Sequence, residues 1–160
     1  MIRTIIPAAL VALMPAAAIT GAHAETHAEA SDPTDAVDAF MQAFDAQDAE
    51  AMRALVVDDV SVSVIEERDG PDRVSAVPLS RLIDTIASST SDLAEPIGHL
   101  QYYERGPVAT VLTDYEFLID GERSHCGTNM FNLLRVDGHW KIAGIAYSHV
   151  EGGCDAGLEE

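Results

Sequence analysis

The chain has 160 residues, with 9 Lys and Arg against 27 Asp and Glu, and a formal net charge of −18. Nucleic acids and anionic lipid surfaces are bound by clustered Lys and Arg, so we expect no nucleic-acid partner. The length suits one domain with a real hydrophobic core. The acidic residues are spread along the chain, which predicts a solvated surface instead of an acidic tail.

The first 24 residues have the three-part form of a secretory signal peptide. Arg3 precedes the apolar run IIPAALVALMPAAAIT, and AHA at 22–24 fits an A-x-A cleavage site. The run is short for a membrane span and contains two prolines. We therefore expect cleavage after residue 24, a periplasmic or secreted protein, and no stable membrane anchor after cleavage. Residues 25–32 are expected to be a disordered lead-in, and 33–160 a single domain.

Helical signals dominate the first half of the domain. Asp32 can cap a helix that begins at Pro33, and Asp48 can cap a second, shorter one. Apolar residues at helical spacing support the first helix and a third over 79–89, namely Val37, Phe40, Met41 and Phe44, then Leu79, Leu82, Ile83 and Ile86. Alternating valines over 60–64 predict a strand between them, followed by a polar loop over 68–78.

The last third predicts antiparallel strands joined by tight turns. Strands are expected over 97–105, 108–119, 123–136 and 139–150. Gly106-Pro107, Asp120-Gly121 and Asp137-Gly138 separate them, and Asp-Gly between apolar runs is a strong hairpin signal. Helices followed by an antiparallel meander predict an α+β fold.

Three strings resemble the nuclear-transport-factor-2-like (NTF2-like) superfamily, which includes SnoaL-like and ketosteroid-isomerase-like proteins. They are VDAFMQAFDAQDAEAMRALVVDDVSV, VATVLTDYEF and DGERSHCGTNMFNLLRVDGHWKIAGIAYS, within residues 33–150. The resemblance implies a cone in which three N-terminal helices pack on the concave face of a curved antiparallel sheet. It also implies a class that contains isomerases, cyclases, dehydratases and proteins without a known reaction.

The sequence departs from the ketosteroid-isomerase pattern. Those relatives carry a Tyr in the first helix and an acidic base just after the second. Here the first helix has Phe40 and Phe44, and the strand after the second reads Val62-Ser63-Val64, without a carboxylate.

The final hairpin can be placed in register from its turn. If Asp137-Gly138 is a two-residue loop, the opposed pairs are Val136–His139, Arg135–Trp140, Leu133–Ile142, Phe131–Gly144 and Asn129–Ala146. One face then holds Phe131, Leu133, Trp140 and Ile142 under the helices, and grades into Asn129, Gly127, Ser148 and His125 at a pocket mouth. The other face would carry Met130, Ile145, Tyr147, Thr128, Cys126 and His149. We expect that outer face to form a homodimer, with cover by the C-terminal tail as the alternative.

The Asp120-Gly121 hairpin leaves two registers open. A strict loop would bury two carboxylates and expose aromatic residues, which is costly. We therefore expect a bulge at Gly121, which places Tyr115 and Thr113 beside His125, Asn129 and Ser148.

Cys126 and Cys154 allow three interpretations. Cys126 could be a nucleophile activated by His149, or it could bind a metal with His149, Cys154 and Asp155. We favour a disulfide, because the protein is expected to be exported and Gly152-Gly153 can turn the chain back toward Cys126.

The sequence predicts a small exported domain that binds an apolar or amphipathic molecule or serves as a structural module. Asn129, Thr113, Ser148 and Trp140 are the expected ligand-binding residues, and no metal or cofactor is expected. The alternative is an isomerase, cyclase or dehydratase in which His125 and Tyr115 act as acid and base.

Overall fold

A computed structural model describes residues 32–67, 70–151 and 154. The predicted signal peptide and nearly all of the predicted lead-in lie outside these residues. Within them, no helix is long and apolar enough to cross a membrane.

Three helices form where the sequence predicts them: α1 (Pro33–Asp45), α2 (Ala49–Ala54) and α3 (Leu79–Ala87). The Asp32 side chain accepts from the Thr34 N–H, and the Asp48 side chain caps α2 in the same way. Both predicted caps are therefore confirmed. The Gln47 side-chain amide donates to the Ile86 carbonyl over 2.9 Å, which ties the α1–α2 turn to α3.

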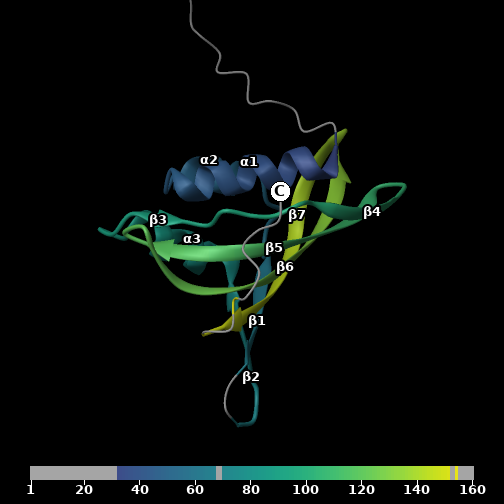
Figure 1. The fold of residues 1–160 in the computed structure, drawn as a ribbon. Helices are drawn as coiled ribbons and strands as arrows, with labels where there is room; N and C mark the ends of the chain where they lie inside the picture. The colour runs from purple at the N-terminus through teal and green to yellow at the C-terminus, as the bar shows by residue number, and fades with distance from the viewer. Residues whose placement is uncertain (1–31, 68–69, 152–153, 155–160) are drawn as a thin grey trace, which may run out of the picture.

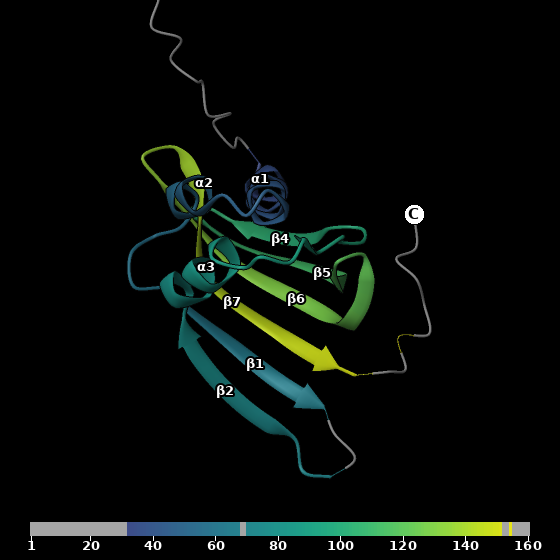
Figure 2. The same ribbon diagram turned by 90° about the vertical axis from the view of Figure 1, so that its left-hand side faces the viewer.

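The strands form one curved sheet with the helices on one side (Figures 1 and 2). Their bounds are β1 (Ser61–Glu67), β2 (Arg73–Pro78), β3 (Leu93–Ala94), β4 (Gln101–Arg105), β5 (Val108–Ile119), β6 (Glu122–Val136) and β7 (His139–Val150). The order is β2-β1-β7-β6-β5-β3, and β4 also pairs with β5. This confirms the α+β cone.

Two details of the sheet differ from the sequence prediction. The sheet is mixed, because β1 runs parallel to β7, whereas an antiparallel sheet was expected. Residues 73–78, predicted as loop, form β2 at the sheet edge, where Val77 pairs with Val62. Edge strands tolerate polar residues and a terminal proline such as Pro78, so their sequence signal is weak.

The core lies between the helices and the concave face of the sheet. Phe131, Leu133, Trp140 and Ile142 are all at most 2% exposed, which confirms the predicted buried face. They pack with Phe40 and other apolar residues of the helices. Burial of this apolar surface is the main stabilising contribution to such a domain.

The β5–β6 hairpin confirms which side chains face the concave side, but its bulge is not at Gly121, where it was predicted. Asp120 and Gly121 form a tight turn with φ of 53° and 81°, a backbone that favours these residue types. The bulge lies further along β6, at Ser124, because Leu118 pairs with Arg123 and Phe117 pairs with His125. Every second side chain from Phe117 back along β5, namely Phe117, Tyr115, Thr113 and Val111, thus faces the concave side as expected.

The β6–β7 hairpin corrects part of the predicted register. Arg135–Trp140 and Leu133–Ile142 pair as expected, but the register then shifts by one residue between Asn132 and Leu133. Asn129 therefore pairs with Tyr147, and Phe131 with Ile145. The pairings of Asn129 with Ala146 and of Phe131 with Gly144 were wrong.

This shift moves the end of β7 from one face to the other. Ile145 and Tyr147, expected on the outer face, lie on the concave face, where both line a cavity. A one-residue bulge reverses the face of every later side chain, and a turn-based register cannot foresee it.

Candidate functional site

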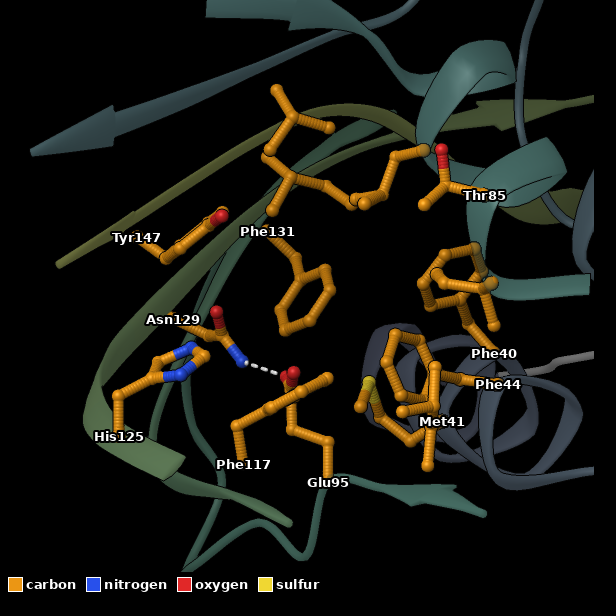
Figure 3. Close-up of a pocket in the computed structure, with 15 residues that line it drawn as sticks. Phe40, Met41, Phe44, Thr85, Glu95, Phe117, His125, Asn129, Phe131 and Tyr147 are labelled. Atoms are coloured by element: carbon orange, nitrogen blue, oxygen red, sulfur yellow. Dashed lines mark hydrogen bonds between the residues drawn. The ribbon is translucent and has the colours of Figure 1, made fainter. Parts of the chain in front are cut away.

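The cone holds a partly open cavity of about 180 Å³ between the helices and the sheet (Figure 3). All four phenylalanines of the chain line it, from α1, β5 and β6. Aliphatic side chains complete most of the wall, and the polar exceptions are Thr85, Glu95, His125, Asn129 and Tyr147. The interior is thus not filled by side chains, and it offers a mostly apolar space with a few polar groups.

Glu95 lines the cavity, although the sequence did not predict it as a site residue. The Asn129 side-chain amide donates a 2.7 Å hydrogen bond to Glu95 Oε1 (Figure 3). The Glu95 backbone N–H donates to Asp45 Oδ1 over 2.9 Å, which anchors the segment to the end of α1. The position of the carboxyl group is therefore fixed from both the helical and the sheet layers.

The segment that carries Glu95 looked like a helix break. In the structure it runs along the edge of β5: Leu93 pairs with Ile119, and Ile97 bridges Tyr115. Side chains of an extended chain alternate in direction, so Leu93 and Glu95 point to the same side. The sequence did carry one signal for this extended segment. Leu93 and Glu95 alternate with Ala94, and Pro96 follows, which is typical of an edge strand because proline is tolerated there.

Burial raises the pKa of Glu95 to about 7, and the negative charge of Asp45 contributes. The hydrogen bond from Asn129 acts in the opposite direction. A carboxyl group with this pKa exists in both protonation states near neutral pH. Such a perturbed group beside an apolar cavity is typical of a functional site.

His125 lines the cavity as predicted, in a stack of rings. Its ring lies 3.9 Å from that of His149 and 4.8 Å from that of Phe117, measured between centroids, both nearly parallel. Burial lowers the pKa of His125 to about 4, and the nearby His149 contributes. His125 is therefore neutral at neutral pH.

Tyr115 lies next to His125 but does not line the cavity. The two rings meet edge to face, 5.8 Å apart. Tyr115 is 2% exposed, and its hydroxyl donates to the Ser148 carbonyl over 2.8 Å. Burial raises its pKa. The hydroxyl is thus engaged with the backbone of β7.

One of the four predicted ligand-binding residues lines the cavity. Asn129 lines the cavity, whereas Thr113, Ser148 and Trp140 are not among the lining residues. Thr113 donates to the Gly98 carbonyl, and the Ser148 hydroxyl accepts from the Thr128 N–H. Trp140 packs in the core, with the Arg135 guanidinium 5.4 Å from its ring centroid.

Cys126 and Cys154 form a disulfide. Both sulfurs are therefore unavailable as nucleophile or thiolate ligand in this state. Asp155, the further ligand considered for a metal, lies outside the described residues. In the part of the chain that the structure describes, no group of three or more His, Cys, Asp or Glu is arranged to hold a metal ion.

The fold and the cavity define an NTF2-like protein. The model of the SnoaL-like domain family matches residues 34–150, so the chain belongs to this family. Comparison with curated proteins finds no significant match.

Solved structures share the fold at low identity. An NTF2-like protein of unknown function from Shewanella baltica is 19% identical, with 73% of this chain and 90% of that chain covered and a TM-score of 0.55. An NTF2-like protein from Cytophaga hutchinsonii is 16% identical, with 72% and 93% covered and a TM-score of 0.60. A protein of Novosphingobium aromaticivorans, provisionally described as the β subunit of an aromatic-ring-hydroxylating dioxygenase, is 16% identical, with 74% and 87% covered and a TM-score of 0.60.

Proposed function

We propose that the protein binds a small, largely apolar molecule with a single ring inside the cone. The observation that carries this proposal is the cavity of about 180 Å³, which is lined by every phenylalanine of the chain. A purely structural module would be expected to fill this space, since protein interiors are close-packed. Dry apolar cavities of about 150 Å³ accept benzene, so this volume suits one ring and is small for a fused four-ring molecule.

Toluene provides a direct test of the cavity. Titration should shift the NMR signals of residues such as Phe131 and Ile145, which lie on the wall. Leu82 lines the cavity from α3, so Leu82→Trp should fill the space and abolish the shifts. Val74→Trp is the matched control, because Val74 is 73% exposed on the edge strand β2 and does not line the cavity. Toluene shifts that persist in Leu82→Trp would contradict binding at this site.

The alternative function is proton-transfer catalysis, as in an isomerase, cyclase or dehydratase. Two observations favour it: His125 borders the cavity, and the pKa of Glu95 lies near 7, where general acid–base groups work best. The engaged hydroxyl of Tyr115 makes Glu95 the better partner for His125 in this scheme. In this scheme Glu95 would abstract a proton from a carbon next to a carbonyl group of the substrate, and the proton would return to a different atom of the same substrate.

Hydrogen–deuterium exchange tests this alternative without a known substrate. Cyclohexanone in D₂O should lose α-protons faster with the protein than with buffer, and Glu95→Gln should remove the acceleration. His125→Ala measures the role of the histidine. Equal exchange rates with and without the protein would contradict proton transfer on this ketone.

We also propose that the protein is exported and acts as a homodimer. Disulfides persist in oxidising compartments, and Cys126–Cys154 supports export. The outer sheet face exposes Tyr103, Leu112 and Leu134, at 68%, 42% and 40%, which supports a sheet-to-sheet dimer. Mass spectrometry of the periplasmic or secreted fraction should find a chain that begins at residue 25. Light scattering of the wild type should give twice the mass of one chain, and light scattering of Leu112→Glu should give the mass of a single chain.

A further inference from the structure

Two hydrogen-bond acceptors border the cavity without a partner among the described residues. The Asn129 side-chain amide uses its N–H to bind Glu95 Oε1, which leaves Asn129 Oδ1 and Glu95 Oε2 unpaired in that part of the chain. Asn129 is only 3% exposed, so water outside the protein hardly reaches it. Both side chains point into the cavity in Figure 3. Among the described residues, no fully buried side-chain nitrogen or oxygen lacks a partner, so these two oxygens are accessible from the cavity, where a donor of a ligand can reach them.

The described residues supply no Lys or Arg to the cavity wall. Arg53 pairs with Asp84, and Arg123 pairs with Glu116, both outside the cavity. His125 is the basic group of the wall, and burial lowers its pKa to about 4, so it brings no positive charge at neutral pH. A positive charge between these two acceptors would therefore come from the ligand.

The remaining walls suit an organic cation with a ring. Phe44 and Phe117 meet edge to face with centroids 6.1 Å apart, and Tyr147 extends from β7 (Figure 3). Aromatic faces attract ammonium groups and pack equally well against another ring. The high net negative charge of the chain also favours approach of a cation over an anion.

We propose that the cavity binds a protonated primary amine carried on a single ring, with the ammonium group between Glu95 and Asn129. This inference rests on the proposed function, because it specifies the ligand of the same cavity. An ammonium group has several donors and can satisfy both acceptors at once. A carbonyl ligand would place its oxygen against Asn129 Oδ1, and a carboxylate would meet Glu95, so both are disfavoured.

Calorimetry at pH 8 with four ligands of one shape tests the proposal: benzylamine, benzyl alcohol, toluene and benzoate. A charge-assisted hydrogen bond strengthens binding by about tenfold or more, so benzylamine should bind at least tenfold more tightly than benzyl alcohol. Benzoate should not bind. Glu95→Gln should weaken benzylamine at least tenfold and leave toluene unchanged. Glu104→Gln is the control, since Glu104 is exposed on β4.

The pH dependence adds a second readout. Around Glu95 lie Asp45 at the end of α1, Tyr115 on β5, His125 and Asn129 on β6, and Tyr147 on β7. Glu95 is the group among them whose pKa lies near 7, so benzylamine affinity should rise between pH 6 and pH 8. Glu95→Gln should remove this rise.

The outcomes separate the two proposals. If toluene binds but benzylamine binds no more tightly than benzyl alcohol, the amine proposal is overturned and the cavity function stands. Binding of benzoate as tight as that of benzylamine would overturn it too, because the site would then not select a cation. If none of these ligands binds, the proposed function itself fails. The ligand series uses the wild-type protein, so it remains decisive even if Glu95→Gln does not fold.

Discussion

Asn129 and Glu95 are 34 residues apart in the chain, yet a 2.7 Å hydrogen bond joins them at the wall of the cavity. Asn129 belongs to the long strand β6, whereas Glu95 lies in the extended segment that follows β3. The bond therefore connects the centre of the sheet to its edge. Glu95 uses the oxygen Oε1 to accept from Asn129, and its other carboxyl oxygen, Oε2, remains available to the cavity.

The raised pKa of Glu95 predicts a pH-dependent cost to stability. The folded pKa of about 7 exceeds the ordinary value of 4.5, so the folded state holds more protons than the unfolded state between these values. The free energy of unfolding should then fall as pH rises from 4.5 to 7. Glu95→Gln removes the ionisation, so it should be more stable than wild type at pH 8, by up to about 3 kcal/mol.

Urea unfolding at pH 5 and pH 8 checks this prediction. The advantage of Glu95→Gln should be present at pH 8 and absent at pH 5, after correction for the lost ionisation in the unfolded chain. Glu104→Gln, at an exposed position of β4, should show no such difference between the two pH values. A stability difference between wild type and Glu95→Gln that is the same at both pH values would show that Glu95 does not titrate in this range.

The fold could be predicted well because its signals are local. Helix caps at Asp32 and Asp48 and the Asp-Gly turns each depend on a few neighbouring residues, and all are confirmed. The concave face was predicted correctly as far as the alternation of β6 held, which placed Asn129 and His125 on the cavity wall.

The remainder of the site depends on features that are not local. The shift near Asn132 brings Tyr147 to the cavity, and nothing in the alternation of β7 indicates it. Glu95 reaches the cavity because its segment is held against β5, at a distance in sequence that no local pattern reports. The disulfide was predicted from compartment and chain reversal, and it is present.

Gly127 should tolerate no side chain. It pairs with Tyr115 across the strands, and a Cβ atom there would overlap the backbone carbonyl of Ser148, which accepts the Tyr115 hydroxyl. Backbone atoms cannot rotate away, so Gly127→Ala must displace β7 or lose the bond. We expect destabilisation of about 1–3 kcal/mol, typical of overpacking in a core.

Thermal or urea unfolding of two alanine variants measures this effect. Gly70→Ala is the control, because nothing lies within 4 Å of a Cβ atom there. It should leave the midpoint nearly unchanged, whereas Gly127→Ala should lower it. Equal midpoints for the two variants would contradict the predicted destabilisation by Gly127→Ala.

The Cys126–Cys154 disulfide should stabilise the end of the sheet. Its cysteines are 28 residues apart, and closure of such a loop contributes about 3.5 kcal/mol on the chain-entropy model. The double variant Cys126→Ser/Cys154→Ser should therefore lose roughly 2–4 kcal/mol in the free energy of unfolding. Wild type in a strong reductant should match the variant, and a wild type insensitive to reductant would contradict the contribution.

His125 should make the protein sensitive to acid. Its folded pKa of about 4 lies below the ordinary value of 6.5, because burial and His149 disfavour the imidazolium. The unfolded state then holds more protons between these values, so stability should fall as pH drops from 6.5 to 4. His125→Phe cannot be protonated and should keep the stack on Phe117, so it should resist acid better than wild type.

The effects of His125 and Glu95 run in opposite directions over nearly the same pH range. In wild type they should offset one another, which makes stability almost flat between pH 4.5 and pH 6.5. Each variant should expose the effect of the other group: His125→Phe should become less stable as pH rises, and Glu95→Gln less stable as pH falls. His99→Phe, at an exposed loop position, is the control for loss of a histidine. Parallel stability curves for both variants would contradict the predicted opposition between the two cavity groups.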